Sequence, residues 1–389
     1  MPNQFSSSQW VEQINQRFQA LFAGLPRVYF SPGRVNIIGE HVDYSGGYVV
    51  PAAIHQGVYL GLTLNDTDVY RIYSLDYNEQ LEFTKEKLYK HYAWFDYLLG
   101  AVHLLHQKNL TIPGFDLMIG GDLPIGKGLS SSAAVECGLI FALNDLLDFH
   151  LSKKEMALLG QKVEWEFIGV QCGLMDQYAN LFSQDGNCLF LDCETFEHEL
   201  LALKNINQQI LLFDSGHTHN LKNSEYNTRR QQAEAACALL SKIYRRAARY
   251  RNFSLAELEV VKDQFDPILY KRAHHILSEI ERTLQAKIYL QQGQSTQLGK
   301  MLYFTHKSLS EDYEVSLPQL DYLVELAKKQ PEILGARLMG GGFGGCTINL
   351  LKPGADLSFI NPMLDTYQKI YPQGGYYLYQ LGGGSQRIS

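Results

Sequence analysis

The sequence predicts a soluble globular protein that contains both strands and helices and is divided into two domains. Its 389 residues are too many for one ordinary hydrophobic core, so two domains are the natural expectation. Hydrophobic residues make up 46% of the chain, yet no uninterrupted apolar run approaches the length of a membrane span. Alternating and helically spaced apolar residues both recur along the chain, which predicts a mixture of strands and helices.

Charge and cysteine usage exclude several classes of function. The chain has 34 Lys and Arg against 41 Asp and Glu, a net charge of −7, so we expect no nucleic-acid surface. No charged-then-apolar leader opens the sequence, so secretion is not expected. The six cysteines lack metal-ligand spacing and are typical of reduced thiols in a cytoplasmic protein. Nothing points to a membrane or to an obligate protein partner.

The first half of the chain alternates strands and helices. An apolar stripe predicts an opening helix at residues 11–22, and further helices are expected at 94–107, 134–147, 153–170 and 172–182. Strands are expected at 27–30, 48–54, 57–64, 69–74 and 115–119. Pro51 fits an edge or a bulge in the second of these strands.

The second half is expected to form the second domain. Strands are predicted at 188–192, 210–215, 334–339, 346–351 and 376–381. Helices are predicted from residue 223 onward, across 254–328, and at 360–370. No linker or repeat separates the halves, so we expect two closely packed lobes, residues 1–200 and residues 201–389.

Residues 123–134, Leu-Pro-Ile-Gly-Lys-Gly-Leu-Ser-Ser-Ser-Ala-Ala, join a predicted strand to a predicted helix. Gly126 and Gly128 let the backbone curl with its N–H groups facing inward, and the helix start adds a partial positive charge. This arrangement predicts a phosphate site. The alternative is a tight loop before a serine-capped helix.

Three familiar phosphate motifs do not fit this stretch. A Walker A loop would need a hydroxyl residue after Lys127, where Gly128 stands. A dinucleotide fingerprint would need a glycine at Ser131. A protein-kinase loop would be followed by a strand, but a helix follows here.

Residues 31–47 carry a dense group of polar side chains around an apolar middle at 35–38. Arg34, Glu40, His41, Asp43 and Tyr44 flank this apolar segment. Donors and acceptors this dense beside a buried strand suit a ligand with many hydroxyls. Two alternatives stay open, half of a metal site at His41 and Asp43, or a solvated turn.

These motifs carry a resemblance to a known family. Residues 123–134 resemble the central motif of the small-molecule kinases related to galactose, homoserine, mevalonate and phosphomevalonate kinases, the GHMP kinases. Residues 33–47 resemble the signature of galactokinases, and the glycine run 340–345 resembles the third motif of the superfamily. The resemblance spans most of residues 27–351. It implies an α+β fold of two lobes, with mixed β-sheets layered with helices and an active site in the cleft between them.

The resemblance also implies the reaction and its site. The reaction is transfer of the γ-phosphoryl of ATP to the anomeric hydroxyl of galactose with Mg²⁺ as cofactor. Asp176 is the implied base, and Arg34 lies beside the reacting groups. The implied sugar-binding residues are Glu40, His41, Asp43, Gly173 and Tyr226. The implied ATP-binding residues are Trp94, Pro124, Gly126, Lys127, Gly128, Leu129, Ser130, Ser131, Ser132 and Ala133. Ser132 and Glu164 are the implied ligands of Mg²⁺, whose preferred ligands are hard oxygens.

Plainer interpretations of several of these residues stay open. Glu164 lies off the apolar stripe of its helix and would suit a solvated face, and Trp94 would suit a hydrophobic core. Asp176 in a first helical turn is stabilised by the helix dipole whatever else it does. Two residues depart from the family pattern, Met339 in place of a hydroxyl residue and Lys127 in place of a small one. The ammonium of Lys127 either adds a phosphate contact or points to solvent.

Two rival functions fit the same motifs. A kinase for N-acetylgalactosamine shares all of them, and the sequence does not separate it from a galactose kinase. A non-catalytic galactose sensor on the same fold is disfavoured, because such relatives have a shortened Ser-Ala run and residues 130–134 are intact here.

Overall fold

The computed structural model describes residues 6–22, 24–124, 126–203, 209–217 and 225–389. Ile125, Asn223 and Ser224, which belong to the predicted motifs, lie outside the described residues. The α-helices are α1 (Ser7–Leu21), α2 (Asp96–Gln107), α3 (Ser131–Leu146), α4 (Lys153–Lys162), α5 (Met175–Phe182), α6 (Glu225–Tyr244), α7 (Leu255–Val260), α8 (Pro267–Gln292), α9 (Ser295–Glu311), α10 (Pro318–Ala327) and α11 (Ile360–Gln368). The strands are β1 (Arg27–Asn36), β2 (Tyr48–Val49), β3 (Pro51–Leu64), β4 (Val69–Ser74), β5 (Glu79–Thr84), β6 (Phe115–Gly121), β7 (Asn187–Asp192), β8 (His198–Ala202), β9 (Gln209–Asp214), β10 (Ile333–Leu338), β11 (Cys346–Leu351), β12 (Gly375–Gln380) and β13 (Gln386–Arg387).

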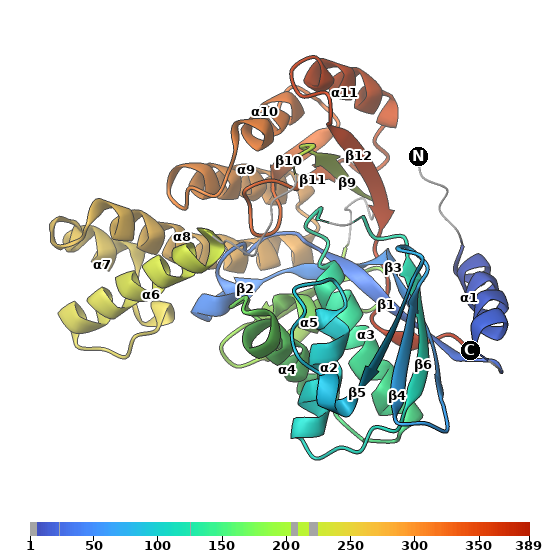
Figure 1. The fold of residues 1–389 in the computed structure, drawn as a ribbon. Helices are drawn as coiled ribbons and strands as arrows, with labels where there is room; N and C mark the ends of the chain where they lie inside the picture. The colour runs from blue at the N-terminus through green and yellow to red at the C-terminus, as the bar shows by residue number, and fades with distance from the viewer. Residues whose placement is uncertain (1–5, 23, 125, 204–208, 218–224) are drawn as a thin grey trace.

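Three sheets organise these elements in the part of the chain that the structure describes. The largest has the strand order β13-β1-β3-β6-β4-β5 and contains one parallel pair, β4 with β6. A four-stranded antiparallel sheet has the order β10-β11-β9-β12, and a small sheet has the order β2-β7-β8. Figure 1 shows the four-stranded sheet with α9, α10 and α11 at one end of the molecule and the six-stranded sheet with α2 and α3 at the other. Mixed sheets layered with helices agree with the α+β fold that the resemblance implies.

Helices cover both faces of the six-stranded sheet. Gly138 of α3 packs against Leu60 of β3, while the next strand residue, Gly61, lies against Ile14 of α1. Successive residues of a strand face opposite sides of its sheet, so α3 and α1 cover opposite faces. The close approach of α3 to β1 and β3 brings the start of that helix to the end of β1 that carries Arg34.

The strand at residues 51–64 differs from the prediction. Two strands, 48–54 and 57–64, were expected, but β3 runs without a break from Pro51 to Leu64. Gly57 makes this possible, because a Cβ there would lie 2.4 Å from the carbonyl oxygen of Ser31 on the neighbouring strand. Pro51 is the first residue of β3, a position where the missing N–H is tolerated. The short strands β5, β8 and β13 were not predicted.

The helix expected at residues 153–170 is also different. The α-helix ends at Lys162 and continues as a single π-helical segment, Val163–Ile168, which stops at Gly169 with a φ of 92°. A π-helical turn contains one more residue than an α-helical turn and is common at functional sites. Glu164, at the start of this segment, is buried, so the solvated interpretation of Glu164 is wrong.

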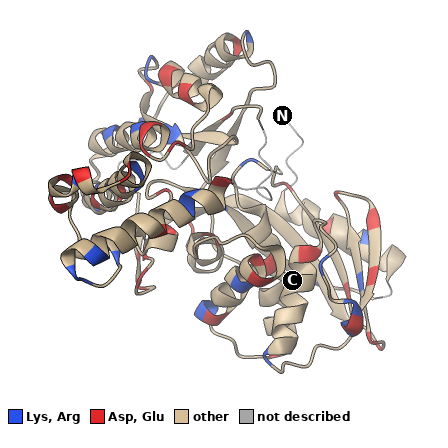
Figure 2. Ribbon diagram, turned by 60° about the vertical axis from the view of Figure 1, so that its left-hand side comes forward, with Lys and Arg blue, Asp and Glu red and all other residues tan. Residues whose placement is uncertain are grey.

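The distribution of charged residues, the state of the cysteines and the hydropathy of the helices bear on the expectations drawn from the sequence. Figure 2 shows Lys and Arg mixed with Asp and Glu on the outer helices. All six cysteines are free thiols. Within the described residues, no helix is both long enough and apolar enough to span a membrane.

Candidate active site

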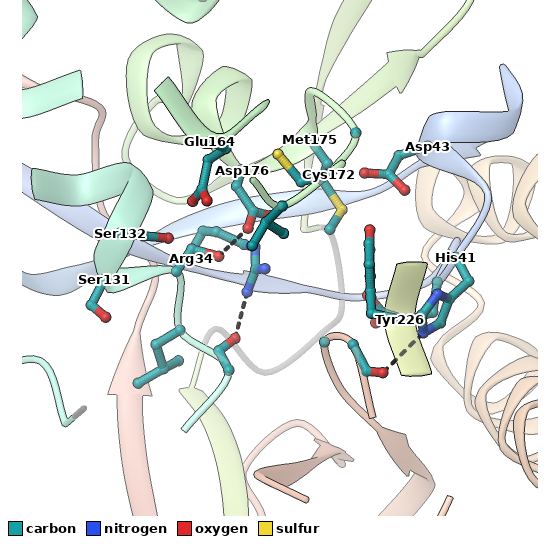
Figure 3. A pocket seen from close by; sticks show the side chains of 18 of the residues that line it. Arg34, His41, Asp43, Ser131, Ser132, Glu164, Cys172, Met175, Asp176 and Tyr226 are labelled. Carbon is teal, nitrogen blue, oxygen red and sulfur yellow. Dashed lines mark hydrogen bonds and ion pairs between the residues drawn. The ribbon is translucent and has the colours of Figure 1, made fainter. Parts of the chain in front are cut away.

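One cavity of about 190 Å³ brings together several stretches that are far apart in the sequence. Its walls come from residues 34–43, from the loop before α3, from residues 170–176, and from Tyr226 with the glycine turn at 340–341. Figure 3 shows Ser131, Ser132 and Glu164 at one end of this cavity and Asp43, Tyr226 and His41 at the other. Asp176 lies between the two groups. Each of the three predicted motifs therefore contributes to one site.

Asp176 is fixed by two strong hydrogen bonds. Arg34 donates from Nε to Asp176 Oδ1 at 2.6 Å, and Ser130 donates from Oγ to Asp176 Oδ2 at 2.5 Å. Arg34 is buried and also donates from Nη1 to the carbonyl oxygen of Gly128 at 2.5 Å. Hydrogen bonds to an ionised carboxylate are short and strong, so they hold Asp176 in one orientation. Ser130 was predicted as an ATP contact, and its bond to Asp176 was missed.

The start of α3 does not have the expected cap. Ser130 occupies the N-cap position with φ 56°, and its side chain makes no capping hydrogen bond. The interpretation as a serine-capped helix is therefore wrong, because the hydroxyl of Ser130 is used by Asp176. The N–H groups in the first turn of α3 are left without a side-chain cap, and Ser131 and Ser132 of that turn line the cavity. Uncapped N–H groups at a helix start favour binding of an anion such as phosphate.

Glu164 and Ser132 lie beside Asp176 and offer two side-chain oxygen atoms that could bind a metal ion. Burial raises the pKa of Glu164 to about 7, an effect that the hydrogen bond from Ser132 opposes. A second carboxylate, Glu136, is fully buried nearby, and its Oε2 has no hydrogen-bond partner among the described residues. The described residues contain no group of three or more His, Cys, Asp or Glu side chains suited to a metal. Mg²⁺ ordinarily takes one or two carboxylates together with substrate phosphates, so this donor set fits Mg²⁺.

Asp43 and Gly173 meet at the other end of the cavity. Burial raises the pKa of Asp43 to about 7, and the carboxylates of Asp176 and Glu40 add to the effect. A Cβ on Gly173 would lie 1.9 Å from Asp43 Oδ2, so only glycine fits there. The run at 172–177 therefore makes room for Asp43 as well as supplying Asp176.

His41 is held as a neutral imidazole. Burial lowers its pKa to about 3. Its Nε2 lies 3.2 Å from the carbonyl oxygen of Gly341, which can only accept, so the proton is on Nε2. Nδ1 then accepts from the hydroxyl of Tyr44 at 2.8 Å, and Tyr44 in turn bonds to Tyr313 at 2.7 Å. Both ring nitrogens are occupied within a buried network, so neither the half metal site nor the solvated turn is correct.

Glu40 is positioned by residues that the sequence analysis missed. Arg337 of β10, fully buried, donates from Nη1 to Glu40 Oε2 at 2.5 Å. Glu279 of α8 accepts from the backbone N–H of Gly39 at 2.9 Å and from that of Glu40 at 3.3 Å. These partners lie 297 and 239 positions away from Glu40 in the chain, and no local pattern indicates them.

A second cavity adjoins the first at the start of α3. Tyr97, Ser131 and Ser132 line both cavities. Trp94 lines the second one, half-buried, with its ring stacked on Tyr77 at a centroid distance of 5.1 Å. A flat aromatic pair next to a phosphate-binding helix start suits a planar heteroaromatic group. Tyr77 was missed because its strand and turn carry no recognisable motif.

Three predicted ATP-binding residues lie outside both cavity walls. Among the described residues, Pro124, Lys127 and Ala133 do not line either cavity. Ala133 is buried in α3, and Lys127 is paired with Asp214 at 2.8 Å. The other predicted site residues line one cavity or both. Met339, which departs from the family pattern, is buried in the hydrophobic core.

Comparisons with known proteins agree with this geometry. Residues 96–184 match the GHMP kinases N terminal domain, residues 286–363 match the GHMP kinases C terminal domain, and residues 16–63 match the galactokinase galactose-binding signature. A galactokinase of Thermotoga neapolitana is 39% identical over 84% of this chain and 89% of its own. A galactokinase of Clostridium beijerinckii is 35% identical over 97% of this chain and 99% of its own.

Solved structures give the same relationship. The crystal structure of Lactococcus lactis galactokinase complexed with galactose superposes with a TM-score of 0.92 at 32% identity, covering 97% of this chain and 100% of that one. Mevalonate kinase from Methanococcus jannaschii, 21% identical over 92% of this chain and 99% of its own, shares the fold with a TM-score of 0.64. The chain therefore belongs to the galactokinase family of the GHMP kinases.

Proposed function

We propose that this protein transfers the γ-phosphoryl group of ATP to the anomeric hydroxyl of galactose, with Mg²⁺ as cofactor. One observation carries the proposal. Asp176 is held by Arg34 and Ser130 in a cavity that has a phosphate-binding helix start at one end and the galactokinase signature at the other. A carboxylate in that place can accept the proton of a sugar hydroxyl that attacks a phosphoryl group held at the helix start.

Asp176 acts as the base. Transfer of a phosphoryl group through a loose transition state needs positioning and charge neutralisation more than covalent chemistry. Asp176 accepts the proton of the anomeric hydroxyl as the oxygen bonds to phosphorus and the bond to the leaving ADP oxygen breaks. Arg34, buried and positively charged, offsets the negative charge that develops beside it. Ser132 and Glu164 would hold Mg²⁺, which supplies neutralisation of charge on the phosphates when bound.

The sugar binds at the end of the cavity lined by the signature. Glu40, Asp43 and Tyr226 offer acceptors and a hydroxyl to the sugar hydroxyls. Glu40 keeps one oxygen on Arg337, which fixes the direction of the carboxylate. Both ring nitrogens of His41 have partners in the absence of the sugar. His41 therefore contacts the sugar with the face of its ring, or its Nε2–H leaves the carbonyl oxygen of Gly341 and donates to a sugar hydroxyl.

The nucleotide spans the two adjoining cavities. The adenine lies against Trp94 and Tyr77, and the phosphates lie at Ser131 and Ser132, which both cavities share. The loop residues Gly126 to Ser130 continue this phosphate site through their backbone N–H groups.

Two further proposals concern the whole chain. Residues 1–200 form a lobe that supplies the signature, the phosphate loop and Asp176, and residues 201–389 form a lobe that supplies Tyr226 and the glycine turn, except that β13 returns to the six-stranded sheet of the first lobe. The protein works in the cytoplasm, which agrees with its six free thiols.

The proposal is tested by ADP release from the purified protein with MgATP and a panel of sugars. Galactose is expected to give turnover, and glucose, its C4 epimer, is expected to give none above background. A site that leaves a buried polar group unpaired rejects such an analogue by up to about 10⁴–10⁵-fold. N-acetylgalactosamine with a higher kcat/KM than galactose would overturn the named substrate. ADP release with no sugar in the panel would overturn the proposed reaction.

A further inference from the structure

An ion pair ties the phosphate loop to the four-stranded sheet. Lys127 Nζ lies 2.8 Å from Asp214 Oδ2, and the two side chains are only 15% and 6% exposed. Gly126 and Gly128 on either side of Lys127 line the first cavity, but Lys127 does not belong to the cavity wall that the structure describes. The ammonium group is therefore directed to Asp214, and neither expectation for Lys127, a phosphate contact or solvent, describes this state.

Asp214 is a rigid anchor. It is the last residue of β9, an interior strand of the four-stranded sheet, and pairs there with Cys346 on β11 and Gly375 on β12. Its second oxygen, Oδ1, accepts from the backbone N–H of Gly216 at 2.9 Å. A carboxylate held by two neighbouring strands and a turn has little freedom, so it fixes the position of Lys127.

The loop that Lys127 belongs to needs such an anchor. Gly126, Gly128 and Ser130 have φ angles of 73°, 76° and 56°, in the left-handed region. That conformation is costly for Ser130, which has a Cβ, and persists only where the surroundings enforce it. The backbone of Lys127 also lies close to the glycine run at residues 340–345. A Cβ on Gly345 would lie 3.7 Å from the carbonyl oxygen of Lys127.

The same loop holds the reacting groups. Gly128, directly after Lys127, accepts from Arg34 Nη1 at 2.5 Å through its carbonyl oxygen. Two residues later, Ser130 donates to Asp176 at 2.5 Å. A shift of the loop at Lys127 therefore moves the helix start that binds phosphate, and with it the partners of Arg34 and Asp176.

We propose that Lys127 is a positioning residue whose ion pair with Asp214 holds the phosphate loop in the shape that binds the ATP phosphates. The inference deepens the proposed function, because it concerns the nucleotide end of the same site. A positioning role for Lys127 and a direct contact of Lys127 with phosphate predict different effects of losing Asp214. If Lys127 only positions the loop, Asp214 is needed as much as Lys127. If Lys127 binds phosphate directly, Asp214 competes for it, and loss of Asp214 frees the ammonium for the nucleotide.

The experiment compares K127M, D214N, the double variant K127M/D214N and the conservative variant K127R. Binding of a non-hydrolysable ATP analogue with Mg²⁺ is measured by calorimetry, together with the KM values for ATP and galactose and the melting temperature. Both single variants are expected to weaken nucleotide binding about tenfold, and the double variant is expected to be no weaker than the singles, because coupled residues are not additive. The galactose KM is expected to stay within about twofold, and K127R to restore most of the affinity, because its charge is retained.

A matched control is the partly exposed pair of Lys287 with Glu199, which joins α8 to β8 at 2.6 Å. K287M removes a lysine ion pair of the same type away from both cavities and is expected to leave nucleotide binding unchanged.

Three results would overturn the inference. D214N that binds nucleotide as well as or better than the wild type, beside a weakened K127M, would make Lys127 a direct phosphate contact. A lower melting temperature with unchanged nucleotide binding in both single variants would make the pair merely structural. Equal weakening in K287M would make the effect non-specific. A wild-type protein that binds the analogue but does not phosphorylate galactose would overturn the proposed function and leave this comparison intact.

Discussion

Replacing Asp176 by Asn removes the proposed base while keeping its shape. The carboxylate accepts at 2.6 Å from Arg34 and at 2.5 Å from Ser130. The amide oxygen of Asn can still accept from Arg34, and the Ser130 hydroxyl can turn to accept from the amide nitrogen, since a hydroxyl both donates and accepts. The side chain is therefore expected to stay in place, so that loss of activity reports on proton transfer and charge.

The expected loss in kcat is about 10²–10⁴-fold, the usual contribution of a positioned general base. This corresponds to roughly 3–6 kcal/mol of activation free energy, at about 1.4 kcal/mol for each factor of ten. The galactose KM is expected to change by no more than a few-fold, because Glu40, Asp43 and Tyr226 still line the sugar end of the cavity.

The assay is steady-state ADP release over a range of galactose and ATP concentrations, with a thermal melt of each variant. A matched control is D116N, which removes the negative charge from another short Arg–Asp pair, Arg71 Nε to Asp116 Oδ1 at 2.6 Å, in the six-stranded sheet. D116N is expected to lower the melting temperature and to keep kcat within about twofold, since its pair touches neither cavity. A kcat for D176N within about threefold of the wild type would refute the role of Asp176, and catalysis would then rest on positioning and Arg34.

Three further predictions concern the metal, the nucleotide and the sugar. E164Q is expected to raise the Mg²⁺ concentration needed for half-maximal activity with an unchanged galactose KM; superimposable Mg²⁺ titrations of variant and wild type would contradict this. W94A is expected to raise the ATP KM several-fold through loss of stacking, and an unchanged value would remove Trp94 from the adenine site. Asp43, with its pKa raised to about 7 by burial, accepts more strongly from a sugar hydroxyl when it is ionised, so the galactose KM is expected to rise by up to about tenfold from pH 8 to pH 6. D43N is expected to abolish that pH dependence, and a wild-type galactose KM that is flat between these pH values would show that ionised Asp43 does not bind the sugar.

Local pattern was enough to predict the elements that carry strong periodicity. The helix after the phosphate loop, the strands β4 and β11, and the short helix that holds Asp176 are confirmed within a few residues. Short edge strands such as β5 and β8 were missed because the alternation of apolar and polar residues along them is weak. The continuous strand β3 and the π-helical segment at Val163–Ile168 depend on contacts with neighbouring elements, which a single sequence does not display.

The residues that position the site were harder to predict than the residues that line it. Arg34, Asp43 and Asp176 lie in motifs whose dense polar side chains indicate a binding site, and all three line the cavity. Arg337, Tyr313 and Asp214 position the site through partners that are far away in the sequence. Each of the three lies in a stretch whose sequence is typical of a hydrophobic core or a turn. Burial of these charged and polar groups becomes visible only when the chain is folded, because their partners come from other elements.

The chemical structure of the product tests the proposed reaction most directly. Galactose uniformly labelled with ¹³C, incubated with the protein and MgATP, is followed by ³¹P and ¹³C NMR until the ATP is consumed. Transfer to the anomeric hydroxyl with Asp176 as the base predicts a single sugar phosphate whose phosphorus couples to C1 of galactose, formed in step with ADP, and no detectable product of this kind from D176N over the same time. The phosphorus of such a product couples to C1 through two bonds and to C2 through three bonds. Coupling of the phosphorus to C3, C4, C5 or C6, or ATP loss with release of free phosphate alone, would contradict transfer to the anomeric hydroxyl.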